Sequence, residues 1–325
     1  MRPMVRILSI DGGGIRGIIP AMVLAEMERR TGRPTCQLFD LIAGTSTGGI
    51  LALALTKPKD GKPEFPAESL VALYEDEGAN IFARSRWRAL LDSWLYAKYP
   101  ADGVEEVLGR YFGAARLEEA LAPALISSYE LERRSPFFFK SAKAKADPAS
   151  HGFLMKDAAR ATSAAPTYFP PALLRGAKGG PHTLVDGGVF ANNPALCAFA
   201  EARVMFPRDS KMVMASLGTG YQVVPIRYAQ ARWWGRLDWM MKGRILDVVF
   251  SGVSDAVDYQ LDQLLPAEGS TRYHHRIQRA LTSAQDEFDD VSPGNLQELK
   301  QEGRRLIEER SAELDQLCGQ LTAAS

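Results

Sequence analysis

The sequence predicts an α/β fold in which helices flank a mostly parallel central sheet and the C-terminal part is helical. In the first 56 residues, apolar runs typical of buried strands alternate with runs that have helical periodicity. A glycine-rich string joins each of these strands to the helix that follows it. The chain has 325 residues and is 46% hydrophobic, which is enough for a large core. We expect a single domain over residues 1–325, with a glycine-motif core at about 5–220 and a helical part at about 228–325.

The elements near the N-terminus follow the order strand, helix, strand, helix. Pro20 lies in the first turn of the first helix and Gly32 just after its end, the positions that these residue types prefer. Strands that alternate with helices in this way usually become parallel neighbours in one sheet. The four elements are a strand at 5–10, a helix at 18–31, a strand at 38–43 and a helix at 48–56.

Helical and strand patterns continue to the C-terminus. Helices are predicted at 67–79, 102–112, 154–163 and 194–206, and strands at 124–130, 136–141, 183–185 and 211–217. Residues 236–265 carry apolar groups at helical spacing, and residues 273–281 predict one more strand. One amphipathic C-terminal helix is predicted from Leu296, Leu299, Leu306, Ile307, Leu314 and Leu317.

A serine lies at the junction of the second predicted strand and the second helix, in the string G-T-S-T-G from Gly44 to Gly48. This string fits the G-x-S-x-G pattern of a nucleophile elbow, in which a serine occupies a sharp strand-to-helix turn with an exposed hydroxyl. The flanking glycines relieve crowding in such a turn. The pattern and its position predict Ser46 as a catalytic nucleophile.

The first glycine-rich string, D-G-G-G-I-R-G from Asp11 to Gly17, also follows a strand. Its backbone N–H groups could stabilise a negatively charged oxygen, so the two strings together suggest acyl transfer or ester hydrolysis. The same string matches G-x-G-x-x-G, and a dinucleotide site with Asp40 as the acidic residue is an alternative. Against it, Asp40 starts the second strand instead of ending it, and the second string would have no role. A P-loop is excluded because no Gly-Lys-Ser/Thr follows.

Two arrangements could supply the base that takes the serine proton. The order Ser46, Asp186, His274 matches an α/β-hydrolase triad, although that fold usually places several strands before its nucleophile. In the other arrangement, Asp186 acts alone. It ends a short predicted strand and precedes Gly187 and Gly188, so its backbone can approach the serine turn, and burial can raise the pKa of its carboxylate toward neutrality.

Three motifs together resemble the patatin-like phospholipases. Asp11 to Gly17 is similar to their oxyanion loop D-G-G-G-x-R-G, and Gly44 to Gly48 is similar to their serine elbow. Asp186 to Gly188 is similar to their D-G-G/A motif, which carries the aspartate of a Ser-Asp dyad. Two further stretches are also similar, residues 159–169 and 186–194. The resemblance runs from about residue 5 to 220 and implies a three-layer fold of the patatin type.

The resemblance also implies roles for individual residues. Ser46 is then the nucleophile and Asp186 the base, while Arg16 holds the first loop or attracts an anionic head group. The oxyanion is stabilised by the amides of Gly12, Gly13 and Gly14, and the supporting glycines are Gly44, Gly48, Gly187 and Gly188. We expect neither a cofactor nor a metal, because this reaction needs none and the histidines have no metal-ligand neighbours in the sequence.

Composition narrows the class of protein. Lys plus Arg number 39, as do Asp plus Glu, so the formal net charge of zero does not support binding of a nucleic acid polymer. The cysteines form neither a disulfide framework nor a zinc pattern, being only Cys36, Cys197 and Cys318. No signal-peptide h-region precedes the first strand, and no apolar run approaches the roughly 18 residues of a membrane span. A cytoplasmic protein with transient membrane association is expected.

All five tryptophans fall in two short segments that also contain basic residues. Such segments suit a lipid–water interface, so both are candidates for peripheral membrane contact. Core aromatics with snorkelling arginines would give the same pattern. The first segment contains Trp87 and Trp94 with Arg84, Arg86, Arg88 and Lys98, and the second contains Trp233, Trp234 and Trp239 with Arg232, Arg236, Met240, Met241, Lys242 and Arg244.

The sequence therefore predicts a serine lipid acyl hydrolase of the phospholipase A or lysophospholipase type, acting on membrane phospholipid or lysophospholipid. An alternative is a phospholipase effector of bacterial antiviral defence with a small cyclic nucleotide as its activator, since the family includes such proteins. The C-terminal part, which matches the family least, is compatible with that gating. A non-catalytic storage or scaffold protein is disfavoured because all residues of the three motifs are present.

Overall fold

The computed structural model describes residues 4–82, 97–176, 180–221, 225–235, 238–239, 244–282 and 287–323, with only the backbone described at 244–247. Its centre is an eight-stranded sheet of order β10-β9-β1-β2-β5-β8-β7, in which β6 also pairs with β5. Strands β10, β9, β1, β2 and β5 are parallel, whereas β6, β7 and β8 pair in antiparallel fashion. The strands are β1 (Met4–Ile10), β2 (Leu41–Thr45), β5 (Ala124–Glu130), β6 (Ser135–Lys140), β7 (Ala172–Arg175), β8 (Pro181–Asp186), β9 (Lys211–Leu217) and β10 (His274–Ile277), with a separate hairpin of β3 (Pro58–Lys59) and β4 (Lys62–Pro63).

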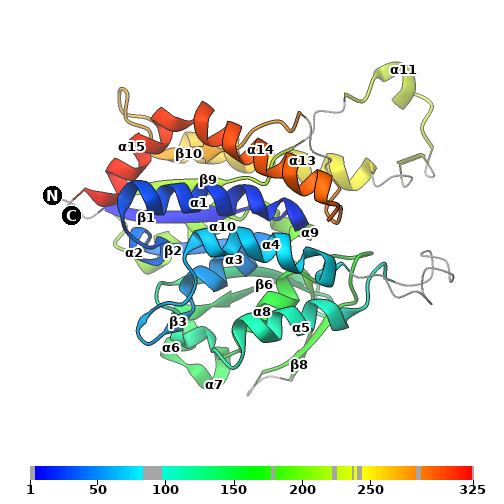
Figure 1. Cartoon of the computed structure of the whole chain (residues 1–325), viewed down its shortest axis with the longest axis horizontal. Coiled ribbons are helices and arrows are strands. Elements are labelled where there is room, and N and C mark those ends of the chain that lie inside the picture. The colour runs from blue at the N-terminus through cyan, green and yellow to red at the C-terminus, as the bar shows by residue number, and fades with distance from the viewer. Residues whose placement is uncertain are drawn as a thin grey trace.

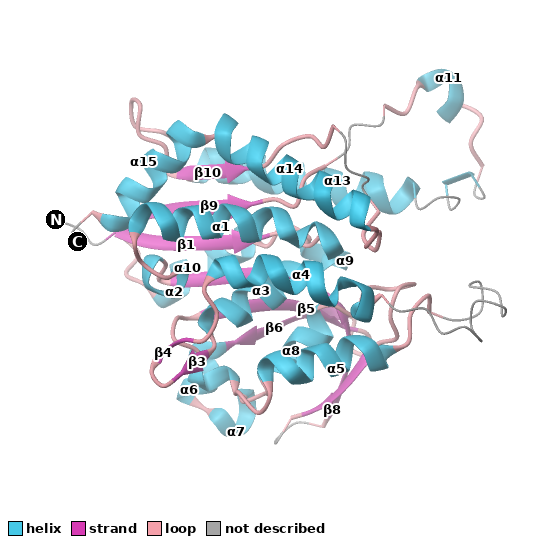
Figure 2. Cartoon of the chain, in the orientation of Figure 1, coloured by secondary structure: helices cyan, strands magenta, loops and turns pink. Residues whose placement is uncertain are grey.

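Helices cover both faces of the sheet and give the molecule three layers (Figure 1 and Figure 2). One face packs against α1 (Ile18–Thr31), α2 (Thr35–Leu38), α3 (Thr47–Thr56), α4 (Ala67–Ile81), α5 (Ala101–Phe112), α8 (Met155–Thr162), α14 (Pro293–Glu309) and α15 (Ser311–Thr322). The other face packs against α10 (Ala195–Met205) and α13 (Arg244–Leu264). The shorter helices are α6 (Ser141–Ala146), α7 (Pro148–His151), α9 (Gly188–Ala191) and α11 (Tyr228–Ala231).

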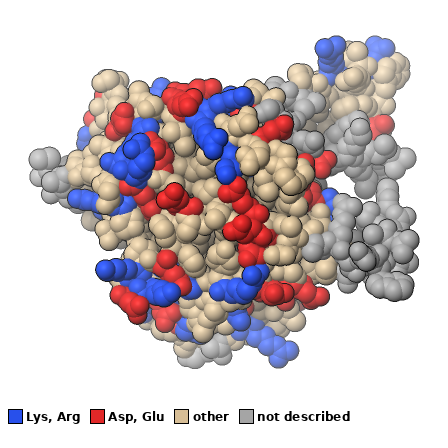
Figure 3. All heavy atoms as spheres, in the orientation of Figure 1, with Lys and Arg blue, Asp and Glu red and all other residues tan. Residues whose placement is uncertain are grey.

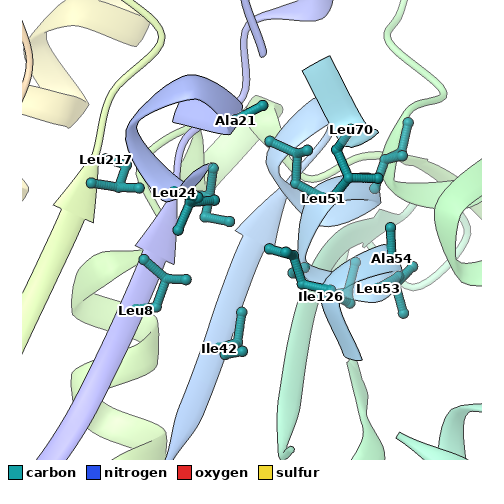
Figure 4. Close-up of a cluster of buried hydrophobic side chains, with 14 of the residues drawn as sticks. Leu8, Ala21, Leu24, Ile42, Leu51, Leu53, Ala54, Leu70, Ile126 and Leu217 are labelled. Carbon is teal, nitrogen blue, oxygen red and sulfur yellow. The ribbon is translucent and has the colours of Figure 1, made fainter. Parts of the chain in front are cut away.

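The two faces of the sheet bury separate hydrophobic clusters, because successive strand residues point to opposite faces. In β1, Val5 and Ile7 pack with α10 and α13, whereas Leu8 and Ile10 pack with the helices of the opposite face. Figure 4 shows part of the larger cluster, in which Leu24 of α1 lies near Leu8. Burial on both faces explains why the central parallel strands β1, β2 and β9 are mostly apolar.

Two strands approach each other end to end along one edge of β5. Strand β2 runs parallel to the first half of β5 and ends with Thr45 opposite Ser127. Strand β8 runs in the opposite direction and ends with Asp186 opposite Ser128. Since β6 pairs with both halves of β5 along its other edge, β2 and β8 must share one edge. Their tips therefore meet, and residues far apart in the sequence become neighbours.

The predicted fold class is confirmed, and several elements have the predicted bounds. The helix predicted at 18–31 and the strands predicted at 124–130 and 211–217 are α1, β5 and β9. The last predicted strand, at 273–281, is shorter and corresponds to β10. In the segment predicted as helical at 236–265, α13 covers Arg244–Leu264, and residues 236–237 and 240–243 lie outside the described residues.

Two element predictions are corrected by the structure. The strand predicted at 38–43 begins only at Leu41, because Thr35–Leu38 form the short helix α2. The single C-terminal helix is two helices, α14 and α15, separated at Arg310, whose backbone leaves the helical conformation. The break allows both helices to pack along α1.

One segment extends away from the three layers, and α11 lies within it (Figure 1). It presents exposed apolar side chains at Ile226, Tyr228 and Trp233. In the part of the chain that the structure describes, no helix has both the length and the apolar character needed to cross a bilayer.

The burial of Leu24 predicts a large effect of truncation on stability. Leu24→Ala removes a fully buried side chain between α1 and the sheet, and should lower the free energy of unfolding by about 2–5 kcal/mol. Val204→Ala is the control, because Val204 is 82% exposed on α10 and should change stability by less than about 0.5 kcal/mol. Urea unfolding of both variants measures the difference, and equal midpoints would contradict the packing described here.

Candidate active site

Ser46 occupies a tight turn between β2 and α3. Its φ of 54° and ψ of −124° place a non-glycine residue in a sparsely populated region of the backbone map. A Cβ atom at Gly44 would overlap the backbone of Gly48, and one at Gly48 would overlap the Ile10 carbonyl, so neither position tolerates a side chain. The Ser46 N–H donates to Thr162 Oγ1 at 2.9 Å, which holds the turn against α8. This is the geometry that the G-x-S-x-G pattern predicts.

Asp186 ends β8 beside Ser46, where the tips of β2 and β8 meet. The Gly188 N–H donates to Asp186 Oδ1 at 2.7 Å, and the Ser46 side chain is close enough to favour the ionised carboxylate. Burial raises the pKa of Asp186 to about 6, although Ser46 and the Gly188 N–H oppose the rise. A Cβ atom at Gly187 would collide with Ser127 of β5, so this glycine permits the close approach of the two tips.

The first glycine-rich loop passes directly over the serine turn. A Cβ atom built on Gly12 would lie 3.3 Å from the Cβ of Ser46. The Gly12 N–H donates to the Asn192 carbonyl at 3.0 Å, so this amide already has a partner. Among the described residues, no acceptor is recorded for the N–H groups of Gly13 and Gly14, and the φ of Gly14 is +56°. Of the three predicted donors, Gly13 and Gly14 therefore have amides available for an oxyanion.

Arg16 contacts the loop through its side chain. Its side chain is buried, its guanidinium lies 4.7 Å from the centre of the Phe288 ring, and its Nε donates to the Gly13 carbonyl at 3.4 Å. The backbone of Phe288 also contributes, because its carbonyl accepts from the Ile15 N–H at 2.9 Å. Of the two roles considered for Arg16, this geometry favours holding the loop.

Four side chains that organise the site were not predicted from the sequence. Thr162 accepts a hydrogen bond from the Ser46 N–H, and Thr219 Oγ1 donates to the Gly12 carbonyl at 2.9 Å. Asn192 Nδ2 donates to the same carbonyl at 3.4 Å, and Arg276 forms an ion pair with Asp11. Thr162 and Asn192 lie in the two further stretches that resemble the family, and Thr219 lies between two glycines. Arg276 has no local signal in the sequence.

All four histidines are described, and their positions do not favour a triad. His274 pairs across β9 and β1 at the level of Leu41, the opposite end of β2 from Ser46, and its Nδ1 lies 2.8 Å from Asp262 Oδ1. His275 bonds to Gln320, His182 packs between phenylalanines, and His151 is exposed on α7. No recorded hydrogen bond joins any of them to Ser46 or Asp186.

The dinucleotide alternative also finds no support in the geometry. Asp40 precedes the first residue of β2 and forms an ion pair with Arg6 at 2.8 Å, whereas the glycine loop lies at the other end of the parallel strands. A ribose at that loop would be out of reach of Asp40, because the dinucleotide fingerprint needs an acidic residue at the same end of the strands as the loop. Within the described residues, no cluster of His, Cys, Asp and Glu could hold a metal ion.

A cavity of about 1010 Å³ opens next to the glycine loop. Asp11, Asn192 and Thr219 line it beside the loop, and Trp234 and Phe250 line it near α11 and in α13. The lining also carries charged side chains, among them Asp258 and Arg276, and includes neither Ser46 nor Asp186.

Comparisons with known proteins identify the family of the chain. The model of the family described as "Patatin-like phospholipase" matches residues 8–199. Patatin-like protein 2 of Oryza sativa subsp. indica is 32% identical, over 96% of this chain and 86% of that protein. Patatin-like protein 4 of Arabidopsis thaliana is 33% identical, over 94% and 84%, and a cGAMP-activated phospholipase of Pseudomonas aeruginosa is 35% identical, over 81% and 76%. The chain therefore belongs to the patatin-like phospholipase family, whose members are lipid acyl hydrolases acting on ester bonds.

Proposed function

We propose that this protein hydrolyses acyl esters of membrane phospholipids or lysophospholipids with a Ser46–Asp186 dyad. The observation that carries the proposal is the contact between a serine in a strained turn and a buried aspartate whose pKa is about 6. A carboxylate with this pKa is basic enough to accept a proton and is still ionised at neutral pH. Two backbone amides without an acceptor among the described residues, those of Gly13 and Gly14, lie on the loop next to the serine.

The reaction then follows the steps of other covalent hydrolases. Ser46 Oγ attacks the ester carbonyl while its proton passes to Asp186, and the Gly13 and Gly14 amides stabilise the oxyanion. Asp186 returns the proton to the departing alcohol, which leaves an acyl group on Ser46. Water activated by the same carboxylate then releases the fatty acid. Ser46 also precedes the N-terminus of α3, where the helix dipole favours negative charge.

The dyad predicts large and selective losses of activity. Ser46→Ala should abolish hydrolysis and labelling by a fluorophosphonate, and Asp186→Asn should lower kcat by about 10²–10⁴ because the base is lost while the Gly188 hydrogen bond can persist. His274→Ala is the control and should keep most of the activity, since His274 bonds to Asp262. Turnover of a soluble short-chain ester measures all three variants. If His274→Ala were as damaging as Asp186→Asn, the dyad would be wrong.

The raised pKa of Asp186 predicts the pH dependence of the reaction. Only the ionised carboxylate can accept the serine proton, so kcat/KM should rise with pH through about 6 and become level above it. Below this pKa it should fall about tenfold for each pH unit. The profile is measured on a soluble ester, with a thermal melt at each pH to exclude unfolding. A profile that stays level down to about pH 4, where an ordinary aspartate titrates, would contradict this role for Asp186.

We also propose that the segment around α11 makes peripheral contact with the membrane. Trp233 is 74% exposed and Tyr228 is 79% exposed, and the Arg232 guanidinium lies 4.5 Å from the centre of the Trp233 ring. Aromatic side chains with adjacent basic groups favour an anionic lipid surface. Figure 3 shows basic side chains at the top of this projecting segment and an acidic one below them, and both signs are also interspersed over the rest of the face shown. That mixture gives no support to a nucleic acid polymer as partner.

Of the remaining tryptophans, two pack against each other and two lie outside the described residues. Trp234 packs against Trp239 with ring centres 5.1 Å apart, so these two stabilise the segment itself. The other predicted tryptophan segment lies outside the described residues except for Lys98, as do several basic and methionine positions of the second segment. These residues are Trp87, Trp94, Arg84, Arg86, Arg88, Arg236, Met240, Met241 and Lys242.

Membrane contact predicts that Trp233→Ala separates two kinds of substrate. Binding to anionic vesicles and hydrolysis of vesicle lipid should fall, while hydrolysis of a soluble short-chain ester should stay within about twofold, because the dyad is untouched. Leu173→Ala is the control, since Leu173 is 61% exposed on β7, at the other edge of the sheet. Equal losses on both substrates with a lower melting temperature would mean that Trp233 supports the fold instead.

A nucleotide-gated phospholipase remains the second candidate function. The observation that favours it is the 35% identity to a protein named as a cGAMP-activated phospholipase. In that case, the purified wild-type protein should be nearly inactive until a cyclic dinucleotide is added.

We further propose that residues 1–325 act as one domain, since β10 extends the central sheet into the C-terminal part.

A further inference from the structure

A buried ion-pair bridge joins the start of the glycine loop to the C-terminal part of the chain. Arg276 of β10 donates from Nη2 to Asp11 Oδ2 at 2.7 Å, and its Nε lies 2.9 Å from Asp258 Oδ2 of α13. Its Nη1 donates to Ser216 Oγ of β9 at 3.0 Å. The side chains of Asp11 and Arg276 are only 4% and 15% exposed. The guanidinium is hydrogen-bonded to Asp11 and ion-paired with Asp258, and these contacts with two carboxylates limit its orientation.

The bridge acts on the residue from which the glycine loop departs. The Asp11 N–H donates to the Leu217 carbonyl at 3.0 Å, so the backbone is fixed on one side and the carboxylate on the other. Gly12, Gly13 and Gly14 follow directly and have no side chains with which to fix their own position. The direction of the Gly13 and Gly14 amides therefore depends on how Asp11 is held, together with the contacts that Asn192, Thr219 and Arg16 make with the loop.

Asp258 also contacts the half of the site that carries the aspartate. Its Oδ1 accepts from Asn193 Nδ2 at 3.0 Å, just after α9, the short helix that follows Asp186 and Gly187. Helix α13 packs against α9 as well. One carboxylate of α13 thus touches the oxyanion half of the site through Arg276 and the aspartate half through Asn193.

We propose that Arg276 is a positioning residue for the oxyanion loop, and that Asp258 fixes Arg276 in this role. The proposal rests on the proposed Ser46–Asp186 mechanism and assigns a function to residues beyond the 8–199 segment that the family model matches. Both side chains also line the cavity beside the loop, but neither is bonded to Ser46 or Asp186. Their effect is on the direction of two amides that act only when the oxyanion forms, so it belongs to kcat and not to KM.

Asp258→Asn tests the proposal with a matched control on the same helix. Asp262→Asn also removes a carboxylate that links α13 to β10, but Asp262 pairs with His274 and not with Arg276. We expect Asp258→Asn to lower kcat on a soluble ester by about tenfold with KM within about twofold, and Asp262→Asn to change neither. Binding of a trifluoromethyl ketone, which forms an oxyanion on Ser46, should weaken by the same factor as kcat.

Arg276→Lys adds a second, independent comparison. Lysine keeps the charge but cannot reach two carboxylates at once, so kcat should fall by about 10², as for a displaced catalytic group, and more than in Asp258→Asn. Thermal melts accompany each variant. If Arg276→Lys does not fold, Asp258→Asn decides the question.

The outcomes separate this inference from the proposed function. A loss of kcat and of ketone affinity in Asp258→Asn, absent from Asp262→Asn, supports the positioning role. Equal effects of the two asparagine variants, or a rise in KM with kcat unchanged, would overturn it. Wild-type protein that neither hydrolyses the ester nor reacts with a fluorophosphonate at Ser46 would instead overturn the proposed function, and the bridge would then be structural.

Discussion

The end-to-end meeting of β2 and β8 along β5 is the constraint on which the rest of the site depends. It brings Ser46 against Asp186 without a third strand between them. Side chains of β5 and its neighbours fix both tips. Thr45 Oγ1 lies 2.5 Å from Ser127 Oγ and donates to the Ala191 carbonyl at 2.6 Å. The serine turn and the helix after the aspartate are therefore tied to one another through the interior of the sheet.

Burial near this junction raises the pKa of two carboxylates. It raises the pKa of Asp186 to about 6, a value that suits the base of the proposed mechanism, and it raises the pKa of Asp11 to about 6 for the same reason. The proposed mechanism uses no proton on Asp11, and Arg276 opposes the rise by favouring its ionised form. A buried carboxylate is costly unless it is paired, so the bridge to Arg276 compensates for a penalty that the location of the site creates.

The sequence predicted the parts of this site that depend on local geometry. The glycines around Ser46 and Gly187 after Asp186 are there because a side chain would collide with backbone or with Ser127, and such requirements appear directly as sequence motifs. Long-range partners leave no comparable signal. The role of Arg276 could not be predicted, because its contact with Asp11 depends on the pairing of β10 with β9. The break at Arg310 was missed because both flanking helices share one apolar periodicity.

Part of the candidate site comes from the C-terminal part of the chain, beyond the residues that the family model matches. The family model stops at residue 199, yet Thr219, Arg276 and Phe288 all contact the glycine loop or its first residue. The contribution of Phe288 includes its backbone carbonyl, which any residue could supply, so the sequence at this position can vary while the contact persists. The loop is therefore held both by its own motif and by three distant partners from the C-terminal part of the chain. The pairing of β10 with β9 places Arg276 on the strand next to the one that precedes Thr219.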